Sequence, residues 1–160
     1  MSRLVVSVII KALNEEKHIA RAIESALRAV STVGGEVILA DSASTDRTVE
    51  IASAYPITIA SLGNPHERCC GIGAQLGYQH ARGEFIYVLD GDMVMHAGFL
   101  EAALACFVGD ATLAGVGGMV CEKNLDSLEY RMRVARASPD LQPGEVGRLD
   151  GGALYQIGRA

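Results

Sequence analysis

The segment EFIYVLDGDM, residues 84–93, joins an apolar run to two aspartates that are separated by one glycine. Residues 85–89 are aromatic, β-branched or aliphatic throughout, which is typical of a strand buried on both faces of a parallel sheet. Asp90 and Asp92 follow where that strand would leave the sheet, and ligands of open α/β sheets bind at this carboxyl end. Two carboxylates around a flexible glycine suit a divalent cation that also carries substrate phosphates. An aspartate and a glycine are equally typical of a simple turn.

The rest of the chain alternates apolar runs with segments of helical periodicity. Strands are predicted at residues 5–10, 37–40, 57–60, 85–89, 113–120 and 151–157. Helices are predicted from Asn14 to Val30, from Ser44 or Thr45 to Tyr55, and over residues 67–82, 97–108 and 124–137, with an exposed loop at 138–148. This alternation predicts an α/β, Rossmann-like fold with a mostly parallel sheet flanked by helices on both faces. The length fits a single domain over residues 1–160.

Composition and charge narrow the classes of function. The net charge of −5 gives no support to a nucleic-acid partner, because proteins that bind nucleic acid usually present a basic surface. No apolar run approaches the roughly 18 residues of a transmembrane segment, and the amino terminus lacks a small-residue cleavage site after its apolar run. We therefore expect a cytoplasmic protein. Association with the inner face of the membrane, through a carboxyl-terminal part beyond Ala160, remains an alternative.

Polar side chains follow three of the predicted strands. Asn14 and Glu15 come after the first strand, Asp41 ends the second, and the pair Asp90 and Asp92 ends the fourth. Neighbouring parallel strands bring their carboxyl ends to the same edge of a sheet, so these groups should share one crevice. That juxtaposition favours a metal site over a simple turn at Asp90 and Asp92.

The segments VSVIIKALNEE (6–16), VILADSASTDRT (37–48) and ARGEFIYVLDGDM (81–93) together carry a family resemblance. In order and spacing they resemble the amino-terminal half of the family 2 glycosyltransferases, which have the GT-A fold, and the match runs over about residues 4–93. The resemblance implies transfer of a sugar from a nucleoside-diphosphate sugar, commonly UDP-linked, to an acceptor hydroxyl. It also implies a divalent metal, Mg²⁺ or Mn²⁺, and inversion at the transferred sugar.

The resemblance assigns donor-site roles to single residues. Those that would border the nucleotide base and ribose are Ala12, Leu13, Asn14 and Glu15. Asp41 would accept a hydrogen bond from the base. Asp90 would face the ribose and the metal, and Asp92 would coordinate the metal that bridges the diphosphate, so both would serve catalysis. Arg68 would contact the nucleotide or its phosphates, although a solvated arginine near a helix start explains it equally well.

The acceptor side is less fully represented in the sequence. Asp150, Gly151 and Gly152 resemble the glycine-rich turn that borders the acceptor, which would be a saccharide or a lipid-linked molecule. A tight turn also accounts for the two glycines. In inverting members the acidic general base follows this turn, and the chain ends at Ala160 before that position. We therefore expect a domain truncated at its carboxyl terminus, which is inactive if it acts alone.

Three positions depart from the family pattern. Lys11 replaces the usual proline, Leu13 stands where an aromatic residue often stacks on the base, and Gln75 replaces a common asparagine. These departures bear on the identity of the base and on affinity for it. They leave the expected fold unchanged.

Alternative functions remain open. A non-catalytic module that binds sugar nucleotides would also carry the donor half alone. Gly71, Gly73 and Gly77 suggest a dinucleotide-binding oxidoreductase, but that fingerprint must follow a strand directly and the polar segment 61–70 intervenes. A nucleotidyltransferase would share the sheet and the metal acids. It would place a glycine-rich basic signature after the first strand, where residues 11–17 instead contain no glycine and carry the acids Glu15 and Glu16.

Overall fold

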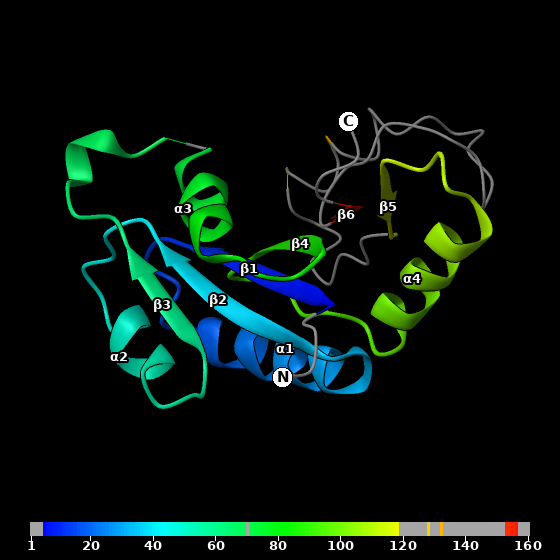
Figure 1. Ribbon diagram of the computed structural model, residues 1–160. Coiled ribbons are helices and arrows are strands. Elements are labelled where there is room, and N and C mark those ends of the chain that lie inside the picture. Colours follow the sequence, from blue (N-terminus) through cyan, green and yellow to red (C-terminus); the bar gives the residue numbers. More distant parts are fainter. Residues whose placement is uncertain (1–4, 70, 119–127, 129–131, 133–152, 157–160) are drawn as a thin grey trace.

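The computed structural model describes residues 5–69, 71–118, 128, 132 and 153–156 (Figure 1). The strands are β1 Val6–Ala12, β2 Gly35–Asp41, β3 Thr58–Ser61, β4 Phe85–Asp90, β5 Gly115–Gly117 and β6 Ala153–Gln156. The helices are α1 Ile19–Val33, α2 Thr48–Ala52, α3 Ile72–His80 and α4 Phe99–Gly109, with a 3₁₀ turn, η1, at Pro65–Glu67. Of the predicted helix 124–137 only residues 128 and 132 are described, both helical, and the predicted loop 138–148 lies outside the described residues.

The sheet has six strands in the order β3-β2-β1-β4-β6-β5. The first four are parallel, and β6 runs antiparallel to both of its neighbours, β4 and β5. This arrangement confirms the predicted α/β class with a mostly parallel sheet. From β1 the chain adds β2 and β3 on one side and then β4 on the other. The order therefore reverses between β1 and β4, at the kind of switch point where ligands of open sheets bind.

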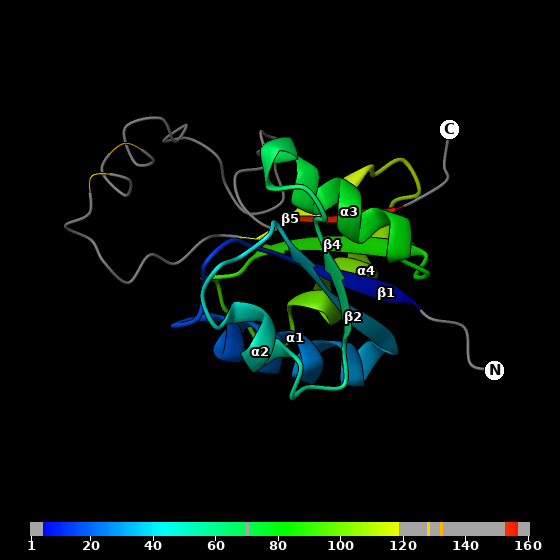
Figure 2. The same cartoon turned by 90° about the vertical axis from the view of Figure 1, so that its left-hand side faces the viewer.

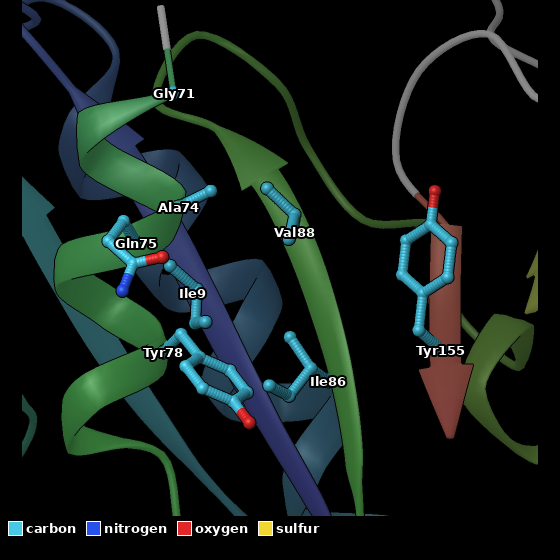
Figure 3. Close-up of a pocket in the computed structure, with 8 residues that line it drawn as sticks. All are labelled: Ile9, Gly71, Ala74, Gln75, Tyr78, Ile86, Val88 and Tyr155. Carbon is cyan, nitrogen blue, oxygen red and sulfur yellow. The ribbon is translucent and has the colours of Figure 1, made fainter. Parts of the chain in front are cut away.

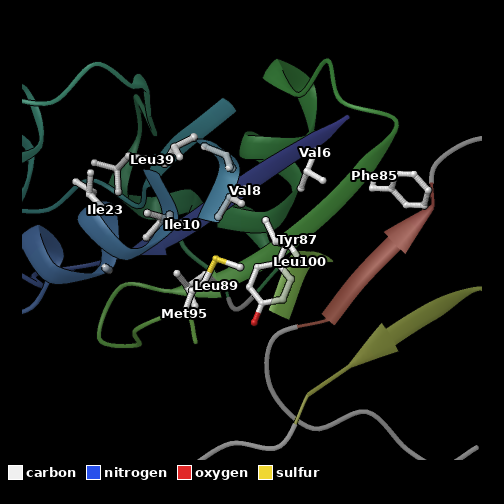
Figure 4. Close-up of a cluster of buried hydrophobic side chains, with 14 of the residues drawn as sticks. Val6, Val8, Ile10, Ile23, Leu39, Phe85, Tyr87, Leu89, Met95 and Leu100 are labelled. Atoms are coloured by element: carbon white, nitrogen blue, oxygen red, sulfur yellow. The ribbon is translucent and has the colours of Figure 1, made fainter. Parts of the chain in front are cut away.

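Helices cover both faces of the sheet, as Figures 1 and 2 show. Helices α1 and α4 pack on one face, with α2 beside α1, and α3 lies on the opposite face. Successive strand residues point to opposite faces, so Val8 and Ile10 of β1 face α1 whereas Ile9 faces α3. The larger core, on the α1 face, joins these valine and isoleucine side chains to Leu39, Leu89 and their neighbours (Figure 4). No helix in the described part of the chain is long and apolar enough to span a membrane.

Helix α3 lies unusually close to β1 because glycines face the strand. A Cβ atom placed on Gly77 would be 2.2 Å from Cγ2 of Ile9, and one on Gly73 would be 3.2 Å from Cβ and Cγ of Lys11. No larger residue fits at position 77 without movement of the helix or of the buried isoleucine. Helix–sheet packing therefore accounts for two of the three glycines that suggest a dinucleotide-binding site.

The predicted start of α1 at Asn14 is wrong. The helix begins at Ile19, and Asn14 adopts a left-handed backbone conformation with φ of 58°. Its side chain cannot cap α1, because Oδ1 accepts a hydrogen bond from the backbone N–H of Thr45, in the loop after β2. A local capping pattern is thus overridden by a contact between two loops.

Two further helix starts differ from prediction. Helix α2 begins at Thr48 and not at residue 44 or 45, because the Asp46 carboxylate bonds the Thr48 N–H and holds the preceding segment in a turn. Helix α3 begins at Ile72 and not at residue 67, since residues 65–67 form the separate turn η1. The Asn64 side chain caps this turn by accepting a hydrogen bond from the N–H of His66 at 3.1 Å.

A partly buried polar network joins the amino ends of the central strands. The Ser7 hydroxyl donates to Glu36 Oε1 at 2.8 Å and accepts a hydrogen bond from the N–H of Gly83 at 2.8 Å. Glu36 Oε1 also accepts from the Arg82 N–H at 2.8 Å, and Oε2 from Arg82 Nε at 3.0 Å. Burial alone would raise the pKa of Glu36, but the hydrogen bonds from Arg82 and Ser7 outweigh it and hold the pKa below its ordinary value.

Candidate functional site

The loops that follow β1 and β2 are joined by hydrogen bonds at the carboxyl edge of the sheet. The Ser42 N–H donates to the Ala12 carbonyl at 2.9 Å, and the Asn14 N–H donates to Ser44 Oγ at 2.9 Å. In return the Asn14 side chain accepts from the Thr45 N–H at 2.8 Å. Each loop thus satisfies polar groups of the other, so the two form one ordered surface.

A second set of hydrogen bonds connects the same two loops further along the chain, and together the two sets form the loop joint. The Glu15 N–H donates to Thr48 Oγ1 at 2.8 Å, and the Glu16 N–H donates to Asp46 Oδ2 at 3.0 Å. Asp46 Oδ1 accepts the hydroxyl proton and the backbone N–H of Thr48. The Asp46 carboxylate is therefore engaged within the loops. The polar cluster after the second strand is the sequence signal for this joint, which sequence analysis did not identify.

Asp41, the last residue of β2, lies beneath the second loop. It is only 2% exposed, and its carboxylate accepts hydrogen bonds from the Ser44 N–H at 3.1 and 3.3 Å. Arg68 holds the same loop from its other side, donating from Nε to the Ser42 carbonyl at 2.8 Å and from Nη2 to the Ala43 carbonyl. The backbone of Ala43 is left-handed, with φ of 61°. The loop over Asp41 is thus held in a specific conformation.

Asp90 and Asp92 flank a buried glycine at the end of β4. The Gly91 N–H donates to the carbonyl of Lys11 at 2.8 Å. A Cβ on Gly91 would be 3.0 Å from Glu15 Cγ and 3.1 Å from the Lys11 carbonyl oxygen. Glycine at this position therefore lets the end of β4 approach the loop after β1. Asp90 precedes this point of contact along the chain, and Asp92 follows it.

Negative charge gathers at this edge. Partial burial and then the charge of nearby Asp92 raise the pKa of Glu15 above its ordinary value, while His18 acts in the opposite direction. Asp90 forms an ion pair with Lys11, with 2.7 Å between Nζ and Oδ1. Lys11 is not among the predicted site residues. The signal that could have identified it is a charged residue within an otherwise apolar strand.

A divalent metal fits this edge when part of its coordination comes from substrate. In the described part of the chain no group of three or more His, Cys, Asp and Glu side chains could hold a metal. Mg²⁺ is commonly held by one or two carboxylates together with substrate phosphates, and Asp90 and Asp92 supply two carboxylates. After burial, the charges of Asp92, Asp46 and Asp90 act to raise the pKa of Glu15, and a cation at this edge would offset them.

The structure brings most of the predicted donor-site residues to one edge. Those at the ends of β1, β2 and β4 or just beyond them are Ala12, Leu13, Asn14, Glu15, Asp41, Asp90 and Asp92. The strand pairing sets Ala12 beside Asp41 and Lys11 beside Asp90. Arg68 contacts the loop after β2, and Asp150, Gly151 and Gly152 lie outside the described residues.

A separate apolar cavity of about 420 Å³ lies on the α3 face of the sheet (Figure 3). Its walls include Ile9, Ile86 and Val88 from the strands, Tyr78 from α3 and Tyr155 from β6. Ile9 on β1 and Ile86 and Val88 on β4 lie on the same face of the sheet as Lys11 and Asp90, which follow them along the two strands. The residues that line the cavity are uncharged, and its polar groups include the side chains of Gln75, Tyr78 and Tyr155.

Comparison with known proteins agrees with this geometry. The family model for glycosyl transferase family 2 matches residues 7–158, while a search of curated proteins finds no significant match. Among solved structures, glucosyl-3-phosphoglycerate synthase from Mycobacterium tuberculosis, in complex with Mn²⁺, UDP and phosphoglyceric acid, is 23% identical with a TM-score of 0.69. The match covers 96% of this chain and 56% of that one.

S. aureus TarS 1–349 in complex with UDP-GlcNAc is 22% identical with a TM-score of 0.61, over 76% of this chain and 38% of that one. The chain therefore spans about half, or less, of the length of the solved structures that it matches. Similarity at this level of identity establishes the fold, which is the Rossmann-like GT-A fold. Because the family model covers nearly the whole sequence, the chain belongs to glycosyl transferase family 2.

Proposed function

We propose that this chain binds a UDP-linked sugar and transfers the sugar to an acceptor hydroxyl with the help of Mg²⁺ or Mn²⁺ and with inversion. The observation that carries the proposal is the position of Asp41, Asp90 and Asp92 at the carboxyl edge of β2 and β4, the two strands that flank β1. Structures of similar fold were solved with UDP, with UDP-GlcNAc and with Mn²⁺, which supports the same class of donor here.

The base would bind between the two joined loops. The Asp41 carboxylate is buried and accepts hydrogen bonds only weakly from the Ser44 N–H, at 3.1 and 3.3 Å. It could accept a stronger bond from an N–H of uracil. Leu13 follows Ala12, the pairing partner of Asp41, and its 42% exposed side chain offers an apolar surface for the base. Ala12, Asn14 and the rest of the loop up to residue 15 would border the base and ribose.

The diphosphate would lie beside Asp92. Asp90 would face the ribose and share the cation with Asp92, and the phosphates would complete the coordination. A cation bound there would neutralise the charge that develops on the leaving diphosphate. Arg68 would act by holding the loop over Asp41. Acceptor contacts by Asp150, Gly151 and Gly152 remain a prediction.

Calorimetric titration of the chain with UDP, in the presence of Mn²⁺ and in the presence of a chelator, tests the donor site. We expect Mn²⁺ to strengthen UDP binding by about tenfold or more, which corresponds to about 1.4 kcal/mol. Asp92→Asn should abolish this gain. Asp110→Asn is a matched control, because Asp110 is exposed beyond the end of α4 and bonds only its own turn. Equal UDP affinity with and without Mn²⁺, or a full metal effect in Asp92→Asn, would sink the proposal.

A sugar-nucleotide-binding module without transferase activity is the second candidate. It is favoured by one observation: the acids that the structure brings to the carboxyl edge of the sheet, Asp41, Asp90 and Asp92, are all assigned to the donor in this proposal. Release of UDP from UDP-sugars in the presence of sugar acceptors separates the two functions. Transfer excludes the module, whereas metal-dependent UDP binding without release or transfer supports it.

A further inference from the structure

Lys11 is a charged residue in a strand whose other six residues are buried. Its side chain lies on the α3 face, where Gly73 leaves room for it: a Cβ at Gly73 would be 3.2 Å from Lys11 Cγ and 3.6 Å from Cδ. The aliphatic part of the Lys11 side chain therefore packs against α3, and its ammonium group lies at the carboxyl edge of the sheet. There the ammonium meets Asp90, its pairing partner on β4, at 2.7 Å.

The ammonium retains capacity for a second anion. A lysine ammonium has three N–H donors, and the Lys11 side chain is 31% exposed while in contact with Asp90. Two arginines near this edge are engaged elsewhere: Arg68 directs its guanidinium to the carbonyls of Ser42 and Ala43, and Arg47 pairs with Glu50. Lys11 is thus the cation whose position, beside Asp90 and the loop to Asp92, suits a phosphate group.

We propose that Lys11 binds the diphosphate of the donor, contacting a phosphate oxygen while it stays paired with Asp90. This inference rests on the proposed function and adds a residue to it. Because the ammonium offsets the charge of Asp90, Asp92 becomes the main ligand that the chain offers to a divalent cation. The same ammonium stabilises the negative charge of the departing diphosphate.

The test compares UDP with uridine, which lacks the phosphates, by calorimetric titration in chelator at low ionic strength. Lys11→Met keeps the length of the stem and removes the charge, and Lys11→Arg keeps the charge. Arg28→Met is the control, since it removes a charge from the exposed surface of α1 near the opposite edge of the sheet. We expect Lys11→Met to weaken UDP binding about tenfold and uridine binding less than about twofold. Lys11→Arg should recover most of the lost UDP affinity, and Arg28→Met should match the unsubstituted chain.

Titration with Mn²⁺ alone gives a second readout. Removing the ammonium leaves the charge of Asp90 uncompensated, so Lys11→Met should bind Mn²⁺ more tightly, on the order of tenfold. If methionine prevents folding, Lys11→Gln removes the same charge at this partly exposed position. UDP affinity that is unchanged in these variants, or that falls in parallel with uridine affinity, overturns the inference and leaves the proposed function standing. Failure of the unsubstituted chain to bind UDP, with or without Mn²⁺, overturns both.

Discussion

Asn14 provides a quantitative test of the joint between the loops after β1 and β2. Its backbone is left-handed, and its Oδ1 accepts the Thr45 N–H at 2.8 Å. Replacement by alanine removes this bond, worth about 1 kcal/mol net at an exposed site. It also leaves a residue with a Cβ in a conformation that disfavours L residues by roughly 1–2 kcal/mol. We expect Asn14→Ala to lower the free energy of unfolding by about 2 kcal/mol.

Asn14→Gly separates the two contributions, because glycine loses the same bond but adopts the left-handed conformation freely. Allowing for the extra freedom of glycine in the unfolded chain, we expect a loss of about 1 kcal/mol. Urea unfolding at neutral pH measures both values, and UDP titration should show weaker binding in both variants because the loop surface is less ordered. Equal stability of the two variants would refute the strain argument. No change in either would refute the role of the joint.

Two further predictions concern the amino end of the sheet and helix α3. Glu36→Gln should lower stability by about 2 kcal/mol, because the Glu36 side chain is 10% exposed, whereas Arg82→Met should cost under about 1 kcal/mol because Arg82 is 70% exposed. Because the folded protein lowers the pKa of Glu36, its carboxylate stabilises the fold fully above the ordinary pKa of about 4.3. This stabilisation is lost as pH falls through the pKa of the folded state. Urea unfolding at a series of pH values should therefore show a smaller loss of stability at acid pH in Glu36→Gln than in the unsubstituted chain. Gly77→Ala should destabilise by about 1–3 kcal/mol through the contact with Ile9, against under about 0.5 kcal/mol for Gly63→Ala, which meets no atom within 4 Å, both measured by urea unfolding.

Sequence reasoning predicted the sheet and the position of Asp41 and Asp90 at its carboxyl edge because both depend on local pattern. Apolar runs such as residues 85–89 mark strands, and the strand itself places Asp41 and Asp90, which end two of these runs. The parallel order of β1, β2 and β4 then brings Asp41 and Asp90 to one edge. Nothing in this reasoning requires knowledge of side-chain contacts, which is why the prediction of a shared edge is confirmed.

Helix starts and the role of Lys11 were beyond the reach of that reasoning. An asparagine followed by two glutamates is a good local cap, yet the Thr45 N–H competes for Asn14 Oδ1 from a loop about thirty residues away. Likewise, the pairing of Lys11 with Asp90 follows only from the register between β1 and β4. Contacts between segments distant in sequence decide both features, and a single sequence does not display them.

The two interpretations of the segment LDGDM, a turn and a metal site, describe the same structure. Gly91 makes the turn, and its N–H bonds the Lys11 carbonyl while its missing side chain lets Glu15 and the loop after β1 come close. That approach places Glu15 where the charges of Asp92 and Asp90 add to the effect of burial in raising its pKa. A turn with a larger residue at position 91 would hold the acids further from that loop. Gly91 therefore contributes to the candidate site by allowing this close approach of the two segments. The ion pair between Lys11 and Asp90 partly compensates the negative charge that results.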